Sequence, residues 1–245
     1  MLILAIESSA KPVSVAVYKA SDEEGSSGRL LGQYFQNNGF SHSRSLLALV
    51  ESLLNNLEIT LADISKIAVA HGPGSFTGVR IGVSAAKGLA WGLEIPVCGV
   101  STLEAMAYQT FFEDTVICPV MDARREQVYN ALFEWRDGTL TRLCDDRVIS
   151  IKELASDLHN YNHPLLFVGD GVDACITYAN RVDESDIFPE YQTTPELLRY
   201  QTAYGVALAS LNSASMPAAI LEPFYLRPSQ AEREQKAREN NQSGL

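Results

Sequence analysis

The chain has 245 residues, 46% of them apolar, and a formal net charge of −11 at pH 7. This length and apolar content suffice for one large domain or two smaller ones and exclude three. The acidic balance repels phosphate backbones, so we expect no direct nucleic-acid binding by the isolated chain.

The first half of the sequence predicts three strands followed by alternating helices and strands. β-rich runs flank a polar hairpin segment, and leucines at helical spacing follow them. The glycine- and proline-rich HGPG then precedes a second helix. The expected elements are strands at 2–6, 13–18 and 30–36, a helix at 43–57, a strand at 67–70, a helix at about 76–93 and a strand at 95–100.

The second half repeats this order more loosely. Its expected elements are strands at 116–121, 127–135 and 143–148, a helix at 150–158, a strand at 165–168, a short helix through 174–178 and a helix at 195–212. The repetition favours an internal duplication and two lobes, 1–105 and 106–214. We expect residues 215–232 to pack back on the first lobe, and the polar tail 233–245 to be frayed.

The cysteines and the first residues bear on the compartment. Cys98, Cys118, Cys144 and Cys175 form no CxxC pair and are interpreted as reduced core residues. The opening MLILAIESS has no basic region, and no run of 18 apolar residues follows. We therefore expect a soluble, cytoplasmic protein without membrane contact.

Four segments carry a resemblance to a known family: ILAIESS, the run HGPGSFTGVRIGVSAAKGLAWGLEIPVCGVSTLEAMA, MDARREQVY and YLRPS. They resemble the TsaB (YeaZ) family over nearly the whole chain. The resemblance implies an α/β fold of the actin and Hsp70 type, with two lobes that each pack helices on a mixed sheet. It also implies a non-catalytic subunit that dimerises with and activates the transferase TsaD, helps to recruit the ATPase TsaE, and serves to build threonylcarbamoyladenosine into tRNA. ATP and a metal ion are then expected on the partner subunits, and no cofactor on this chain.

The resemblance also indicates where catalysis is missing. TsaD carries a His-His-Leu-x-Gly-His segment, and the positions of its two metal ligands are Thr102 and Met106 here. Neither side chain replaces imidazole on iron or zinc, so we expect no transferase centre. A metallopeptidase is a further alternative, but none of the four histidines has a neighbour that completes a His-Glu-x-x-His pattern.

An autonomous ATPase or kinase of the same fold is the main alternative. It would use a nucleotide cleft formed by two turns, Glu7, Ser8 and Ser9 in the first and Gly169, Asp170 and Gly171 in the second. These residues could be a vestigial phosphate site or two ordinary turns. HGPGSFTG lacks the Gly-Lys-Ser/Thr ending of a phosphate loop. The residues 124–126 of MDARREQVY are either a salt-bridged hairpin tip or a contact for a partner or ligand.

The two helices of the first half predict a protein interface. In the first helix we expect Leu47, Val50 and Leu54 to face the sheet, which leaves an apolar edge without a partner. In the second helix, small residues at helical spacing favour close approach of another helix, although packing within its own lobe is an alternative. The predicted interface residues are Leu46, Leu49, Leu53, Gly78, Gly82, Ala85, Ala86 and Leu89. The resemblance implies that TsaD binds these two helices, and that the free protein can form a homodimer through the same face.

Overall fold

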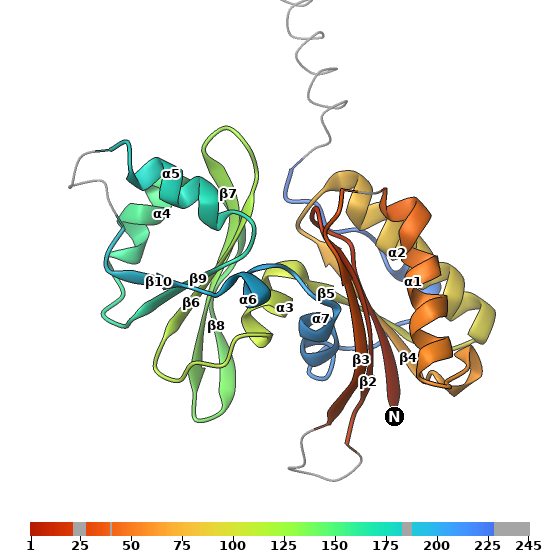
Figure 1. Ribbon diagram of the computed structural model, residues 1–245. Coiled ribbons are helices and arrows are strands. Elements are labelled where there is room, and N and C mark those ends of the chain that lie inside the picture. Colours follow the sequence, from red (N-terminus) through yellow and green to blue (C-terminus); the bar gives the residue numbers. More distant parts are fainter. Residues whose placement is uncertain (22–27, 40, 183–187, 228–245) are drawn as a thin grey trace, which may run out of the picture.

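The computed structural model describes residues 1–21, 28–39, 41–182 and 188–227 and shows two lobes side by side (Figure 1). Each lobe is built on a five-stranded sheet, with orders β3-β2-β1-β4-β5 and β10-β9-β6-β7-β8. Among the residues described, none of the helices combines the length and apolar character that a membrane crossing requires. The predicted tail 233–245 lies outside the described residues.

The first lobe confirms the predicted order of strands and helices. Its elements are β1 Leu2–Glu7, β2 Val13–Lys19, β3 Arg29–Gln36, α1 His42–Asn56, the 3-10 turn η1 Leu61–Asp63, β4 Lys66–Gly72, α2 Phe76–Leu93 and β5 Val97–Ser101. β1 pairs antiparallel with β2 and parallel with β4, which places it in the middle of the sheet. Helices cover both faces of a sheet centre of this kind, and its strands are therefore almost wholly apolar.

Alternate residues of β1 serve two different cores. Leu4 and Ile6 pack toward α1 and α2, whereas Ile3 and Ala5 pack toward α7, Ala203–Ala209. The first lobe is thus a sheet with α1 and α2 on one face and α7 on the other. α7 falls within the range predicted for the second lobe, but it contacts β1, β2 and β4 of the first sheet.

The single helix predicted at 195–212 is wrong. The structure has two helices there, α6 Glu196–Arg199 and α7, separated by extended backbone at Tyr200 and Thr202. The Thr202 hydroxyl accepts a hydrogen bond from the Gly205 N–H, 3.3 Å, and so caps α7. The extended residues carry the chain from the second lobe to the first. Helix propensity alone cannot predict where such a change of lobe interrupts a helix.

The second lobe repeats the topology of the first. Its elements are β6 Val116–Asp122, β7 Gln127–Arg136, β8 Thr139–Ser150, α4 Ile151–Leu158, β9 Leu165–Val168, α5 Val172–Ala179 and β10 Tyr191–Thr193. β6, β7 and β8 form an antiparallel meander, and β9 and β10 extend the sheet parallel to β6. Both sheets therefore have equivalent strand orders and directions. β10, and the helix α3 Thr102–Tyr108 between the lobes, were not predicted.

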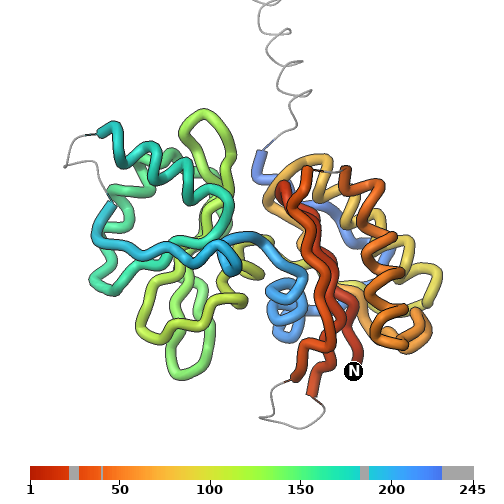
Figure 2. The backbone as a smooth tube through the Cα atoms, in the orientation of Figure 1, coloured from red at the N-terminus to blue at the C-terminus, as the bar shows by residue number. Residues whose placement is uncertain are grey.

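The end of the described chain returns to the first lobe, as Figure 2 shows. Met216 pairs with Val97, and the 3-10 turn η3 Ala218–Ile220 packs against α2. Leu221 is buried in the first core. We call residues 221–227 the strap.

Candidate functional site

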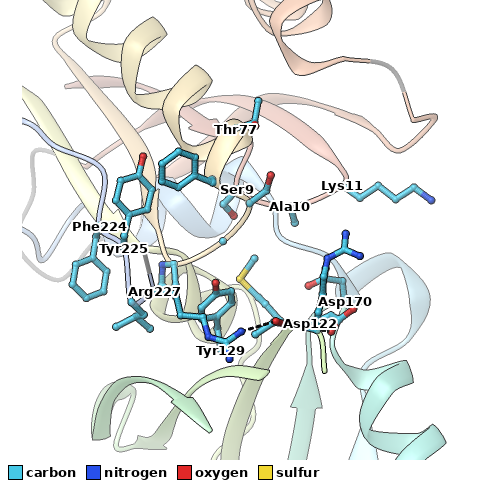
Figure 3. A pocket seen from close by; sticks show the side chains of 18 of the residues that line it. Ser9, Ala10, Lys11, Thr77, Asp122, Tyr129, Asp170, Phe224, Tyr225 and Arg227 are labelled. Carbon is cyan, nitrogen blue, oxygen red and sulfur yellow. Dashed lines mark hydrogen bonds between the residues drawn. The ribbon is translucent and has the colours of Figure 1, made fainter. Parts of the chain in front are cut away.

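A cavity of about 760 Å³ lies between the lobes. Ser9 and Thr77 line it from the first lobe, and Asp122 and Asp170 from the second (Figure 3). The strap contributes residues 224–227 to its walls. A volume of this size is ordinary for a small-molecule site. The two predicted nucleotide turns contribute Ser9 and Asp170 to its lining.

Glu7, at the end of β1, is a buried acid rather than an open ligand. Its Oε1 accepts hydrogen bonds from the Ser9 N–H and hydroxyl, both 2.6 Å, while Oε2 is buried with no partner among the described residues. Burial is the largest influence and raises the pKa of Glu7 to about 7; the Ser9 hydrogen bonds oppose it, and the charge of Asp170 adds to it. A carboxyl of this kind is partly neutral near pH 7.

The structure brings the two predicted turns to the same cleft, where their hydrogen-bond donors are already used. The Ser8 hydroxyl donates to the Gly78 carbonyl, 2.9 Å, and the Ser9 hydroxyl donates to Glu7. In the second turn, the Gly169 N–H donates to the Arg199 carbonyl and the Gly171 N–H to the Val120 carbonyl, at 2.8 and 3.0 Å. A phosphate bound by these groups would have to displace bonds within the protein.

Asp170 is held in place on the second side of the cleft. Its Oδ1 accepts a hydrogen bond from the Gln201 side chain, 2.8 Å. Burial raises the pKa of Asp170, and the Gln201 bond opposes that effect. The charge of Asp122 raises the same pKa further. Basic side chains face the same cavity, because Lys11, Arg124 and Arg227 line it together with Asp122 and Asp170.

Thr102 and Met106, the positions of the missing metal ligands, lie in α3 and are fully buried. Met106 packs in an apolar cluster that includes Ile117 and Phe133. Within the described ranges, no three His, Cys, Asp or Glu side chains come together in a way that could hold a metal ion. Met106 is therefore part of the core.

Two of the histidines have structural partners. His42 Nε2 lies 2.7 Å from the Ala10 carbonyl. His71 Nδ1 lies 3.1 Å from the Glu222 carbonyl, and its ring stacks on Phe224. Burial lowers the pKa of His71. Both rings fix loops around the cleft.

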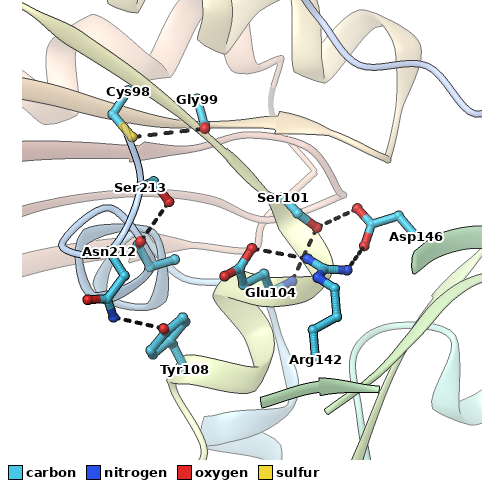
Figure 4. A network of polar contacts seen from close by, with 10 residues as sticks. Cys98, Gly99, Ser101, Glu104, Tyr108, Arg142, Asp146, Asn212 and Ser213 are labelled. Atoms are coloured by element: carbon cyan, nitrogen blue, oxygen red, sulfur yellow. Dashed lines mark hydrogen bonds and ion pairs between the residues drawn. The ribbon is translucent and has the colours of Figure 1, made fainter. Parts of the chain in front are cut away.

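A polar network joins the lobes beside α3 (Figure 4). Arg142 of β8 forms ion pairs with Asp146, 2.6 Å, and with Glu104 of α3, 3.0 Å. The Ser101 hydroxyl donates to the other oxygen of Asp146, 2.5 Å. These contacts fix the segment that follows β5, which contains Thr102 and Met106.

The predicted orientation of α1 is confirmed for Val50 and Leu54, which are buried, and wrong for Leu46, Leu47 and Leu53. Leu46 and Leu53 are 1% and 2% exposed and pack in the first core, whereas Leu47 is 55% exposed. Residues at spacings of four and three share one helix face, so Leu46, Val50 and Leu53 form a single stripe that faces the sheet. Leu47 lies about 100° away on the helix and points outward. Leu49, at the edge of the stripe, is half-buried.

The predicted small-residue stripe of α2 packs mainly inside the lobe. A Cβ at Gly78 would lie 2.1 Å from the Ser8 carbonyl oxygen, and one at Gly82 would lie 2.3 Å from the Ser8 hydroxyl. Ala86 is also buried, and Ala85 and Leu89 are half-buried. The glycines are thus needed where α2 crosses β1, and the alternative of packing within the lobe holds for this face.

A different face of α1 and α2 is open, and on α1 it also carries the exposed side chains of Arg44 and Glu51. Trp91 is 72% exposed. Gly88 and Gly92 have no atom within 4 Å of an added Cβ, so nothing in the described chain requires a glycine there. We define the open helix face as Leu47, Ala48, Ser84, Gly88, Trp91 and Gly92, all of them exposed. A Trp-Gly pair late in a helix that has only two charged residues is the sequence signal that could have identified it.

Comparisons with known proteins agree on one family. The model of the family "tRNA N6-adenosine threonylcarbamoyltransferase", TsaD, matches residues 38–234. The chain is 38% identical over 169 residues to the tRNA threonylcarbamoyladenosine biosynthesis protein TsaB of Bacillus subtilis, covering 69% of this chain and 71% of that one. The Escherichia coli protein of the same name is 37% identical over 136 residues, 55% of each chain.

A solved structure supports the fold. The structure of YeaZ from Pseudomonas aeruginosa superimposes with a TM-score of 0.72 at 23% identity and covers 92% of this chain and 99% of that one. With the two mixed sheets packed with helices, this likeness confirms the expected two-lobed fold of the actin and Hsp70 type.

Proposed function

The chain belongs to the TsaB (YeaZ) family and takes part in the biosynthesis of tRNA threonylcarbamoyladenosine, and from this premise we propose that it is a non-catalytic subunit. In this proposal it binds and activates the transferase TsaD and helps to recruit the ATPase TsaE. ATP and a metal ion act on those partner subunits. The open helix face is the surface that meets TsaD, and it can join two copies of the chain when TsaD is absent.

The interior of the chain supports a role without chemistry of its own. Thr102 and Met106 are buried where the transferase carries metal ligands, and the network around Arg142 fixes that segment as structure. The donors of the two cleft turns are occupied by Glu7 and by backbone carbonyls. These residues provide neither ligands for a metal-assisted transfer nor free hydrogen-bond donors for a phosphate.

The single observation that supports the proposed interface is that Gly88 and Gly92, which no described residue requires, lie beside the exposed Trp91. Glycine within a helix costs about 1 kcal/mol relative to alanine, and neither Gly88 nor Gly92 is required by a neighbour in the described chain. Small residues let a second helix approach closely. Trp91 is the type of side chain that dominates interface energetics, and its full burial is worth on the order of 3 kcal/mol.

Binding to TsaD tests the proposal. We expect Trp91→Ala to weaken the complex by about 2 kcal/mol, roughly 30-fold, and Gly88→Glu to abolish it because the charge would be buried without a partner. Leu197→Ala in α6 of the second lobe is the matched control, because Leu197 is 88% exposed and lies outside this face. Calorimetric titration that gives one affinity for all four proteins would refute the proposed surface.

A further inference from the structure

The strap is anchored to α2 by the two charged residues of that helix. Lys87 Nζ donates hydrogen bonds to the carbonyls of Ala219 and Leu221, at 3.1 and 2.9 Å. Arg80 Nε donates to the Tyr225 hydroxyl, 2.8 Å. The first lobe thus holds both ends of the segment 219–225.

Aromatic packing strengthens the second of these anchors. The Tyr225 ring stacks on Phe76, with 4.5 Å between centroids, and the Arg80 guanidinium lies 3.8 Å from the Phe76 centroid. The Phe224 N–H donates to the His71 carbonyl at the end of β4, 2.7 Å. As far as Tyr225 the strap is therefore part of the first lobe.

The strap then crosses to the second lobe. Arg227 donates to the Ala123 carbonyl, 2.8 Å, and to the Gln127 side chain. Ala123 follows β6 and Gln127 is the first residue of β7, so Arg227 contacts both ends of the turn between these strands. Figure 3 shows the Arg227 side chain extending from the strap toward Tyr129 of that lobe. In Figure 1 the blue end of the described backbone lies at the top of the gap between the lobes, while α3 and α6 lie lower down.

The turn that Arg227 contacts has an energetically unfavourable backbone conformation. Arg124, Arg125 and Glu126 have φ of 64°, 58° and 55°, three left-handed residues in succession with no glycine among them. Turns of this hand normally use Asn-Gly or Gly, because an L side chain crowds its own backbone there. Such a run persists only where its surroundings hold it.

The bonds within the turn and the bonds from the strap together supply that hold. The Ala123 N–H donates to the Gln127 carbonyl, 2.9 Å, and the Asp122 carboxylate accepts from the Arg124 N–H, 2.7 Å. Arg227 is bonded to the first and the last residue of the five-residue turn and so bridges its ends. Glu126 is also held from its own lobe, because its carbonyl accepts from the Ile151 N–H, 2.9 Å, and its carboxylate pairs with Arg181, 2.8 Å. Loss of the Arg227 bridge therefore weakens the hold mainly at the ends of the turn, Ala123 and Gln127.

We propose that the strap is an interlobe clasp, in which Arg227 holds the lobes closed over the cavity and keeps the 123–127 turn in its left-handed form. Release of the strap at either anchor opens the cleft and lets the turn unwind. Two of the anchors on the first lobe, Arg80 and Lys87, are α2 side chains, and a third is the His71 carbonyl at the end of β4. An event on α2 thus reaches a turn in the other lobe through the strap. This inference does not depend on the proposed partner.

Hydrogen exchange of the full chain, read by mass spectrometry, tests the clasp together with small-angle scattering. In Arg227→Gln we expect exchange of the turn amides Ala123, Arg124 and Gln127 to rise about ten- to hundredfold, as loss of one or two charged hydrogen bonds implies. The radius of gyration should increase as the lobes part. Exchange in β1 and β6 should stay as in the unmodified chain, which shows that both lobes remain folded.

Lys87→Met gives the decisive arm, because Lys87 lies in the first lobe and touches only the other end of the strap segment. The clasp requires faster exchange in the 123–127 turn here too. Arg136→Gln, which removes the ion pair between the exposed Arg136 and the buried Glu134 in the second lobe, is the control for loss of an arginine contact and should leave the turn unchanged. The proposal is overturned if Arg227→Gln leaves turn exchange or the radius of gyration unchanged, or if Lys87→Met accelerates exchange only within the strap.

Discussion

Substitution of Glu7 by glutamine should remove a pH dependence of stability that the fold creates by burying a carboxyl. Burial raises the pKa of Glu7 from 4.5 to about 7. The folded state therefore binds more protons than the unfolded state between these values, and stability falls as the pH rises through this window. A shift of about 2.5 units corresponds to roughly 3 kcal/mol, present below pH 4.5 and lost above pH 7.

Glutamine keeps the geometry that the neutral acid has. Its carbonyl oxygen can accept both Ser9 hydrogen bonds, which lie at 2.6 Å in the structure, and it cannot ionise. We expect Glu7→Gln to match the unmodified chain near pH 4.5 and to exceed its free energy of unfolding by about 2 to 3 kcal/mol at pH 8.

Urea unfolding at intervals from pH 4.5 to pH 8.5 measures this difference. Glu51→Gln on the exposed side of α1 is the control for removal of a glutamate as such. Acids that do not interact with Glu7 cancel in the comparison, whereas Asp170, whose charge raises the pKa of Glu7, does not. A difference between Glu7→Gln and the unmodified chain that stays constant across the range, or that falls as the pH rises, would refute the reasoning.

The remaining predictions concern packing and ligands. Leu46→Ala should cost about 2 to 5 kcal/mol and Leu47→Ala less than about 0.5, by chemical unfolding; equal costs would contradict the corrected orientation of α1. Gly82→Ala should destabilise the protein by about 1 to 3 kcal/mol because the added Cβ meets Ser8. Gly88→Ala should stabilise it by about 0.5 to 1 kcal/mol because the added Cβ meets nothing in the described chain. The reverse order of stability in thermal unfolding would refute the assignment of the two faces. Calorimetric titration of the isolated chain with magnesium and ATP should show no saturable heat, and micromolar binding would favour the autonomous ATPase or kinase instead.

Local pattern was a reliable guide to the elements of the first lobe. Apolar runs such as 2–6 and 67–70 and the leucine-rich segment 43–57 differ in period, so their types follow from the sequence. The break at 200–202 could not be predicted from the local pattern. The helix is interrupted there because α7 packs on the first sheet, whose strands begin almost 200 residues earlier in the chain. A local period contains no information about which lobe a segment joins.

The interface was likewise predictable from the sequence only in part. The sequence indicated that α2 is almost uncharged, but each of its faces contains glycine or alanine, and pattern alone selected Gly78 and Gly82. The structure shows that those two glycines pack against Ser8, directly after β1, which leaves Gly88, Trp91 and Gly92 open. Contact with a residue 70 positions away decides which face of the helix is free.

By itself the sequence determined the chemical inventory: threonine and methionine stand at 102 and 106, and no arrangement of the backbone can turn them into metal-binding imidazoles. Only the tertiary structure decided how the groups that are present are used. The Ser8 and Ser9 hydroxyls could each donate to a phosphate, yet they are bonded to Gly78 and Glu7. Arg227 lies about 100 residues from the turn it grips, and its role exists only because the folded chain brings the two together. Side-chain identity is local and can be read from the sequence, whereas partners, burial and pKa depend on neighbours that only the fold supplies.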